Sequence, residues 1–274
     1  MAGDGIAVSR SADGRVGYIK LDRPRYGNAV SMAMWKALPE AVRELESSPG
    51  CGAIVLHGSG RHFCTGIDLG VLSTIAKLDQ NEAESAATLR DLILVMQNSV
   101  SSLEACAIPV VAAIHGACYG AGVDVITACD IRYATSDAIV CVKEVDVGVT
   151  ADLGTLQRLP AIVGEGLARD LAMTARPISG ADAERMHLVS SSAFASPEAV
   201  LAAAESTARE LADKDAFALR GTKHVMNAAR ASANAGGLAY VAAWNAGHLK
   251  GRRLVALMAK EKAKKKAKVV RAKL

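Results

Sequence analysis

Apolar and polar side chains alternate along two short segments near the start of the chain, residues 5–9 and 15–21. An Asp-Gly pair lies between them and tolerates the positive φ of a tight turn, so the pattern predicts an opening β-hairpin. Apolar residues then recur three and four positions apart from Met34 to Leu45, directly after Ser31. This spacing predicts an amphipathic helix with a serine N-cap, which a Pro-Gly pair ends.

Short apolar runs further along the chain predict buried strands, with a less regular candidate at Leu188–Ser191. The runs are Ala53–His57, Val110–His115, Ile131–Ala134 and Ile139–Val142. Helical spacing extends from about Glu82 to Glu104, follows a Gly/Ala-rich turn at residues 116–122, and dominates from Leu156 onward.

Strands that alternate with helices predict an α/β fold. We expect a catalytic core in residues 1–196 and a helical C-terminal region with a basic tail in residues 197–274. The chain's 274 residues, 51% of them apolar, are enough to bury a large core. Its longest apolar stretch, residues 106–129, is interrupted by proline, histidine, glycines and an aspartate, so we expect no membrane span.

Positive charge is concentrated at the C-terminus. Residues 260–274 hold seven lysines and one arginine against one glutamate, whereas the whole chain has a net charge of +4. The remainder is therefore faintly acidic and lacks the dispersed basic face of a nucleic-acid-binding protein. We expect no nucleic-acid partner, although a non-catalytic protein that uses this tail on RNA or anionic lipid is an alternative. The histidines lack ligand spacing, so we expect no metal.

Three carboxylates stand in apolar, glycine-rich surroundings: Asp124, Glu144 and Asp152. Charged side chains in such runs are costly unless they are paired or used. Burial raises the pKa of a carboxyl group toward neutrality, where proton exchange is easy. For each residue by itself, a structural role as a helix cap or as a partner of Arg132, Lys143 or Arg158 is the favoured interpretation, because ion pairs also shift pKa values.

Two turns add a second feature, residues 63–69 and residues 120–124. Each turn follows a predicted buried strand and leads toward a helix, which leaves unpaired backbone N–H groups at a helix N-terminus. Two such donors can hold one oxyanion. A glycine-rich turn can also answer a purely backbone requirement.

The segment Ile108–Pro160, IPVVAAIHGACYGAGVDVITACDIRYATSDAIVCVKEVDVGVTADLGTLQRLP, resembles the signature region of the crotonase (enoyl-CoA hydratase/isomerase) superfamily. His57–Leu69, HGSGRHFCTGIDL, also resembles it, and the similarity extends from about Gly5 to Val189. The resemblance implies ββα turns wound into a right-handed spiral. It also implies C-terminal helices that assemble the chain into a homotrimer or a hexamer made of two trimers.

The placement of Asp124, Glu144 and Asp152 is similar to that in the dienoyl-CoA isomerases of this superfamily. It implies conversion of 3,5-dienoyl-CoA to 2,4-dienoyl-CoA in the β-oxidation of unsaturated fatty acids, with no cofactor, because CoA is part of the substrate. Glu144 would take the C2 proton, Asp152 would serve C6, and Asp124 would tune Glu144 electrostatically. The alternative is an enoyl-CoA hydratase on the same fold, in which Asp124 would activate water.

The family's oxyanion hole carries over to the N–H groups of Ile67 and Ala121. Many members have glycine at the second position, and a backbone donor survives the change to alanine. The loop that would line the acyl-CoA channel comprises Thr65, Gly66, Ile67, Asp68 and Leu69. We expect Asp68 to stabilise the turn rather than to catalyse, because short acidic side chains bond to local N–H groups.

The chain ends in Ala272-Lys273-Leu274, which is similar to the Ser-Lys-Leu address for peroxisomes. We therefore expect a peroxisomal import receptor as a partner and a location in peroxisomes or a glycosome-like organelle. A mitochondrial location is less expected, because the first residues do not resemble an Arg/Ser-rich transit peptide.

Overall fold

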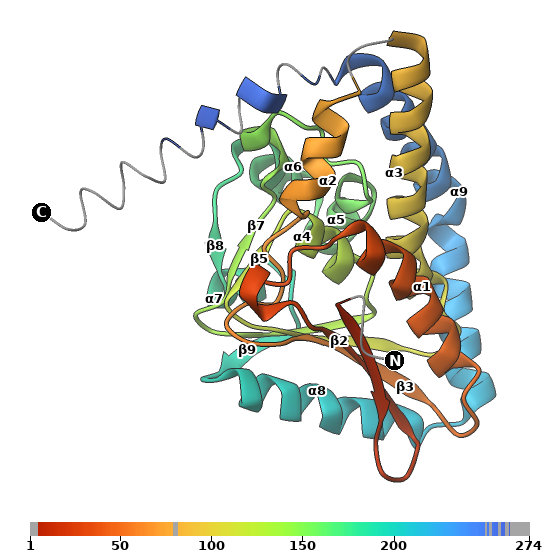
Figure 1. Ribbon diagram of the computed structural model, residues 1–274. Helices are drawn as coiled ribbons and strands as arrows, with labels where there is room; N and C mark the ends of the chain where they lie inside the picture. Colours follow the sequence, from red (N-terminus) through yellow and green to blue (C-terminus); the bar gives the residue numbers. More distant parts are fainter. Residues whose placement is uncertain are drawn as a thin grey trace, which may run out of the picture.

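A six-stranded sheet occupies the lower part of the molecule in Figure 1. The computed structural model describes residues 5–78 and 82–249, together with 251, 254–256, 259, 260 and 263. The sheet has the order β1-β2-β3-β4-β6-β9, antiparallel between β1 and β2 and parallel elsewhere. Its strands are β1 (Ile6–Arg10), β2 (Val16–Leu21), β3 (Ala53–Gly58), β4 (Val110–Ile114), β6 (Ile131–Thr135) and β9 (Ser191–Phe194).

The elements predicted at the start of the chain are confirmed. The β1–β2 hairpin turns at Gly14, which adopts a φ of +71°. The hydroxyl of Ser31 accepts a hydrogen bond from the backbone N–H of Met34 and caps helix α1 (Met32–Glu46). The apolar positions of this helix are buried, as their spacing requires.

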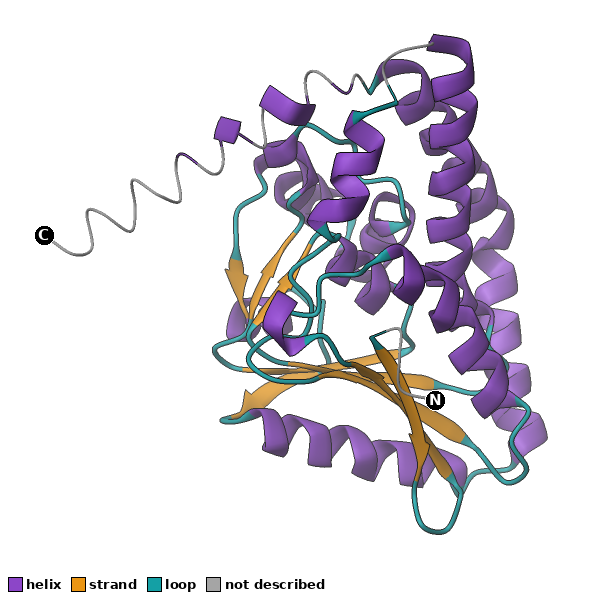
Figure 2. Ribbon diagram, viewed as in Figure 1, coloured by secondary structure: helices purple, strands orange, loops and turns teal. Residues whose placement is uncertain are grey.

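Both faces of the large sheet are buried, which explains the apolar run at residues 53–56 of β3. Ile54 and Leu56 face the main core, whereas Ala53 and Val55 face helix α8 (Pro197–Ala212). Successive side chains of a strand point to opposite faces, so a strand covered on both sides needs apolar residues at every position. Figure 2 shows α8 along one face of the sheet and most of the other helices on the opposite side.

A second, three-stranded sheet stands beside the first. It has the order β5-β7-β8 and contains β5 (Ala117–Tyr119), β7 (Ile139–Cys141) and β8 (Ile178–Ser179). The chain passes from the large sheet to the small one at Gly116, whose φ is +56°. A Cβ atom at this position would lie 2.1 Å from the carbonyl oxygen of Arg61, so only glycine fits the turn.

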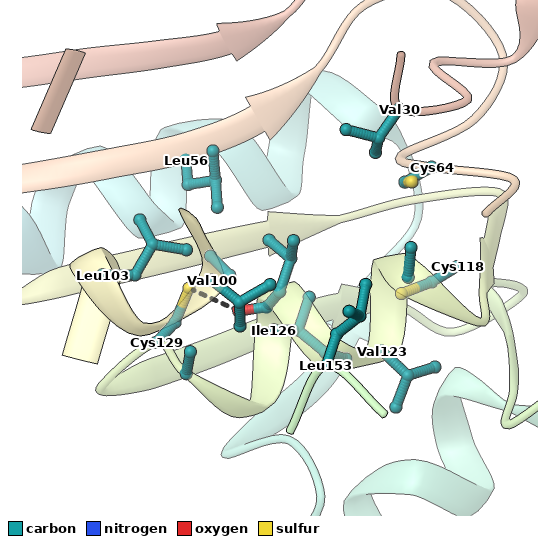
Figure 3. Packing of buried hydrophobic residues seen from close by; sticks show 14 of the residues in the cluster. Val30, Leu56, Cys64, Val100, Leu103, Cys118, Val123, Ile126, Cys129 and Leu153 are labelled. Carbon is teal, nitrogen blue, oxygen red and sulfur yellow. Dashed lines mark hydrogen bonds between the residues drawn. The ribbon is translucent and has the colours of Figure 1, made fainter. Parts of the chain in front are cut away.

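The elements repeat in a spiral, and the predicted fold class is confirmed. Each repeat places one segment in the large sheet, one in or beside the small sheet and then one or more helices. The first repeat comprises β3, the segment at Cys64, α2 (Leu69–Ala76) and α3 (Glu82–Ala105). The second comprises β4, β5 and α4 (Ala121–Thr127), and the third comprises β6, β7, η2 (Glu144–Val147) and α5 (Thr155–Val163). Helix α4 lies at the centre, with Val123 and Ile126 among other buried apolar side chains in Figure 3.

Some short elements were not predicted. Helix α2 and strands β5 and β8 have too few residues to show a period, and the predicted strand at Leu188–Ser191 is displaced. Leu188 and Val189 are buried but lie in a bend after helix α7 (Gly180–Arg185), and β9 begins only at Ser191. The remaining short elements are η1 (Pro24–Tyr26), α6 (Glu165–Thr174) and α7 (Gly180–Arg185).

The C-terminal helices pack on the core. Helix α8 begins at the predicted boundary, Pro197, and covers the large sheet, while α9 (Ala216–His248) lies along α3. Lys223 of α9 is buried, and its ammonium group donates to Asp130 and to the carbonyl oxygens of Leu103 and Ile108. A division into domains at residue 196 stays a prediction. Residues 264–274, with the predicted targeting tripeptide, lie outside the described residues.

Candidate functional site

Two backbone segments are joined at a parallel bridge between Cys64 and Cys118. The N–H of Cys64 donates to the carbonyl of Ala117, and the N–H of Tyr119 donates to the carbonyl of Cys64, at 3.0 and 2.9 Å. The two predicted oxyanion residues, Ile67 and Ala121, each follow this bridge by three positions. The bridge therefore holds the two predicted turns side by side.

The backbone geometry leaves the N–H groups of Ile67 and Ala121 free. Val30 donates to the carbonyl of Gly66 and accepts from the N–H of Asp68, so in this extended segment the intervening N–H of Ile67 points away from Val30. Ala121 is the first residue of α4, where N–H groups have no partner within the helix. Within the described part of the chain, neither N–H donates to any acceptor.

A small cavity of about 70 Å³ opens beside these two amides. Asp124, Glu144 and Asp152 line this cavity together with Ile67 and Ala121. The rest of the wall is apolar: Leu72, Ile75, Leu89, Ile93, Met96, Val147, Val149, Leu153, Leu249 and Leu254. The structure thus brings together all three predicted carboxylates and both predicted amide donors, from segments up to 85 residues apart.

Asp124 is the most firmly held of the three carboxylates. It lies in α4 and is 1% exposed, and its Oδ1 accepts hydrogen bonds from both the backbone N–H and the hydroxyl of Thr155, each at 2.7 Å. Burial raises the pKa of Asp124 to about 6, and the two bonds from Thr155 oppose a larger rise. Asp124 is thus the acid of this cavity with the greatest tendency to be ionised at neutral pH.

Asp152 precedes helix α5 and has one donor on its carboxylate. Its Oδ2 accepts a hydrogen bond of 2.6 Å from the side-chain amide of Asn245 in α9. Burial raises the pKa of Asp152 to about 7, the bond from Asn245 opposes this rise, and the charge of Asp124 adds to it.

Glu144 opens the short helix η2 and has a buried carboxylate oxygen, Oε2, with no hydrogen-bond partner in the described part of the chain. The other oxygen, Oε1, lies above Gly120, where a Cβ atom would approach it to 3.1 Å. Burial and the charges of Asp124 and Asp152 together raise the pKa of Glu144 to about 8, against backbone N–H groups of Glu144 and Lys143 that lower it.

The order of proton affinity among the three acids reflects burial, the like charges of their neighbours and the side-chain donors that each carboxylate receives. Asp124 accepts two bonds from Thr155, Asp152 accepts one side-chain bond from Asn245, and Glu144 receives no side-chain donor on its buried Oε2 from the residues that the structure describes. A donor stabilises the ionised form, while burial and like charges destabilise it. The cavity can therefore store protons on Glu144 and Asp152 and exchange them near neutral pH.

The predicted channel loop is only partly at this cavity. Of its five residues, Ile67 alone is in the wall. Asp68 caps α2 by accepting from the N–H of Gly70 at 2.7 Å and pairs with Arg23 at 2.9 Å, which confirms its local structural role. Leu69 is 60% exposed, Thr65 donates weakly to the carbonyl of Tyr26, and Gly66 provides the positive φ of the turn.

A second, more open cleft of about 360 Å³ shares Glu144 with the small cavity. It lies against η2, α5 and α6, and its wall is mostly apolar, with Val142, Leu156, Leu159, Ala168, Ala172 and Met173. Glu144 consequently stands between the two cavities.

Three polar residues around the carboxylates were not predicted from the sequence: Thr155, Gln97 and Asn245. They lie 31, 55 and 93 residues from the groups that they bond, and no local motif marks such pairings. Leu249 and Leu254, which line the same cavity beyond the end of helix α9, were also not predicted, because no local motif marks them. The part of the chain that the structure describes contains neither a cluster of potential metal ligands nor a helix long and apolar enough to cross a membrane.

Known proteins share this sequence and architecture. A family model for enoyl-CoA hydratase/isomerase matches residues 11–244. A peroxisomal delta(3,5)-delta(2,4)-dienoyl-CoA isomerase from Arabidopsis thaliana is 42% identical over 245 residues, 88% of each chain. The mitochondrial human enzyme of the same name is 39% identical over 250 residues, 89% of this chain and 75% of that one.

Solved structures agree with the sequence relatives. The crystal structure of an enoyl-CoA hydratase/isomerase from Mycobacterium paratuberculosis superposes with a TM-score of 0.79 and 27% identity, over 93% of this chain and 98% of that one. The spiral of ββα turns and a family match that spans most of the sequence lead to the same result. The chain belongs to the enoyl-CoA hydratase/isomerase family.

Proposed function

We propose that this chain is a dienoyl-CoA isomerase that converts 3,5-dienoyl-CoA to 2,4-dienoyl-CoA during the oxidation of unsaturated fatty acids. One observation carries the proposal: Asp124, Glu144 and Asp152 share a cavity with the free N–H groups of Ile67 and Ala121. The names of the relatives from Arabidopsis thaliana and human support the same reaction. CoA enters as part of the substrate, and the reaction needs no further cofactor.

The two amides supply the electrostatic stabilisation that the reaction requires. A proton next to a thioester is far too weak an acid for an unassisted carboxylate to remove. The N–H groups of Ile67 and Ala121 bind the thioester oxygen and stabilise the negative charge that develops on it as the proton leaves. One such donor typically contributes on the order of 100- to 1,000-fold in rate.

The carboxylates move the protons. Glu144 removes a proton from C2, and the electrons of that bond pass to the thioester carbonyl, which gives a dienolate with its negative charge on the oxygen held by the two amides. When the dienolate collapses, the carbonyl re-forms, the C2–C3 double bond forms and the C3–C4 double bond shifts to C4–C5. The electrons of the C5–C6 double bond take a proton from Asp152 at C6. Two separate groups are needed because C2 and C6 are too far apart for one short side chain, and the cavity provides them on η2 and before α5.

The proton affinities of the two groups suit this direction of transfer. Glu144, with a pKa of about 8, is the stronger base and receives the proton from C2. Asp152, with a pKa of about 7, is the stronger acid and supplies the proton for C6. Groups whose pKa values lie near the working pH are effective in both roles. Each turnover exchanges the protonation states of the pair, which solvent must then restore.

Asp124 stays fixed by Thr155 and acts through its charge. Its negative charge raises the pKa of Glu144 and of Asp152. This interaction brings the pKa values of the pair near the working pH, so that Glu144 and Asp152 can exchange protons, without a direct contact with the substrate.

The nearest alternative, an enoyl-CoA hydratase on the same fold, is tested by giving the protein both substrates. A 3,5-dienoyl-CoA should yield the absorbance of a conjugated diene, whereas a 2-enoyl-CoA should lose its enoyl band only slowly. Rapid loss of the enoyl band with no gain of diene would establish the hydratase and refute the isomerase.

Removal of either proton-transferring carboxylate should abolish most turnover. Glu144→Gln and Asp152→Asn should each lower kcat by about 100- to 10,000-fold, because each loses a general acid or base. The dissociation constant for acyl-CoA, measured by titration calorimetry, should change little. Asp146→Asn is the matched control, since this acid lies in the same short helix but is exposed and pairs with Lys143. Full activity in either cavity variant would remove that residue from the mechanism.

The pH dependence of kcat/KM should be bell-shaped with its maximum between about pH 7 and 8. Below this range Glu144 is protonated and cannot act as a base, and above it Asp152 is ionised and cannot act as an acid. Asp124→Asn removes the negative charge that raises both pKa values, so the whole profile should move to lower pH. An unchanged profile in this variant, compared with Asp146→Asn, would contradict the electrostatic role of Asp124.

We also propose that the chain assembles as a homotrimer or as a hexamer of two trimers through its C-terminal helices. Helix α9 exposes large apolar side chains, including Phe217 (88% exposed) and Tyr240 (69% exposed). Such groups on one helix indicate a surface that another protein chain covers. Sedimentation velocity should give three or six times the 28.4 kDa chain mass, and Phe217→Ser with Tyr240→Ser should reduce it. A monomer or a dimer of the unaltered protein would refute the assembly.

For its location we propose the peroxisome or a glycosome-like organelle. The support is the C-terminal Ala272-Lys273-Leu274, which an import receptor would bind, and the peroxisomal relative from Arabidopsis thaliana. Deletion of the tripeptide should leave a fluorescent fusion in the cytosol. Import of the deleted chain would refute the assignment.

A further inference from the structure

Asn245 connects the long C-terminal helix to the carboxylate cavity. It is 3% exposed, and its side-chain amide donates to Oδ2 of Asp152 at 2.6 Å and to the carbonyl oxygen of Thr150 at 2.9 Å. A buried amide with two bonds in this arrangement restricts the rotation of the Asp152 carboxyl group. Loss of the amide would leave a buried acceptor without its donor.

A second amide holds the same stretch of backbone from another side. Gln97 of α3 donates to the carbonyl oxygen of Asp152 at 2.6 Å and to that of Leu238 in α9 at 3.0 Å. Gln97 therefore fixes where the backbone of Asp152 lies, while Asn245 also bonds to the carboxylate itself. Gln97 thus supports the backbone of Asp152, and Asn245 supports its side chain.

We propose that Asn245 is a positioning residue that orients the Asp152 carboxyl group in the cavity and stabilises its ionised form. The inference about turnover depends on the proposed isomerase function. The inference about ionisation does not, because it concerns contacts present in the protein without substrate.

The surroundings of Asp152 make this neutral donor important. The charged groups that act on its carboxylate are Asp124, from α4, and Glu144, from η2, and both are acidic. Within the described part of the chain, Asn245 provides the side-chain hydrogen bond that this carboxylate receives. Burial and like charge therefore favour the protonated acid, and the Asn245 amide opposes both.

This opposition gives Asn245 a function in the reaction. With its donor in place, Asp152 binds a proton less tightly than Glu144, which has no donor on its buried Oε2. The difference makes Asp152 the acid and Glu144 the base of the pair. Without the donor the pKa of Asp152 rises toward that of Glu144, and the proton is delivered to C6 less readily.

The test compares the intact protein with Asn245→Leu, which keeps the branched shape and removes the amide. The ionisation of Asp152 is measured by NMR on protein labelled with ¹³C at the aspartate carboxyl groups, with the Asp152 signal assigned by its loss in Asp152→Asn. The matched control is Gln97→Met, which removes the bonds to the Asp152 backbone and retains the donor on its carboxylate. Asn245→Ala serves as a second variant if the leucine prevents folding.

We expect the Asp152 signal of Asn245→Leu to titrate about one pH unit higher than in the intact protein, a tenfold change in its ionisation constant. Gln97→Met should titrate as the intact protein does. In the isomerase assay, Asn245→Leu should lower kcat about tenfold with little change in KM, and the alkaline limb of its pH profile should move to higher pH.

The role of Asn245 and the isomerase function can be refuted separately. An unchanged Asp152 titration in Asn245→Leu, or an equal shift in Gln97→Met, would overturn the proposed role of Asn245. If the unaltered protein still isomerised 3,5-dienoyl-CoA, the proposed function would stand. A shifted titration in a protein that does not isomerise 3,5-dienoyl-CoA would support the role of Asn245 and refute the proposed function.

Discussion

Three carboxylates that face one small, largely apolar cavity cannot all be ionised, and this electrostatic constraint determines how the site is built. Each ionised acid raises the pKa of its neighbours, so at least one proton is shared within the group near neutral pH. Hydrogen-bond donors, together with burial and like charge, determine which of the three acids holds that proton. Thr155 fixes Asp124 with two bonds, Asn245 gives Asp152 one, and Oε2 of Glu144 has none in the described part of the chain.

The spiral fold supplies the other half of the site, the two free amides. A bridge between two cysteine-containing segments sets the turn at Ile67 beside the start of α4 at Ala121. Neither amide needs a charged side chain to attract a developing oxyanion. The fold thus brings fixed donors and titratable acids to one cavity, and helices α3 and α9 hold Asp152 through Gln97 and Asn245.

Much of this arrangement could be predicted from the sequence, because local patterns of apolar residues and turn residues determine it. The hairpin, the capped helix α1, the buried strands and the helix after Gly120 follow from periodicity and turn residues, and the resemblance to the crotonase superfamily connected them into a spiral. The three acids could be selected because charge is unusual in apolar, glycine-rich segments. Two-residue strands such as β8 have no detectable period.

The support of the acids could not be predicted for a different reason. Thr155, Gln97 and Asn245 are ordinary polar residues in helical segments, and their importance arises only from contacts across 31 to 93 residues of sequence. The loop residues Thr65 and Leu69 lie outside the wall of the small cavity. Their assignment to the acyl-CoA channel, which the resemblance implied, stays a prediction.

The central claim is that two different carboxylates serve the two ends of the diene, and an isotope label tests it most directly. A 3,5-dienoyl-CoA carrying deuterium at C2 is converted in ordinary water, and the product is analysed by NMR. Transfer through Glu144 and a separate Asp152 predicts that the deuterium lost from C2 passes to water and that C6 gains ordinary hydrogen. Deuterium recovered at C6 would mean that one group carries the proton across, and it would contradict the account.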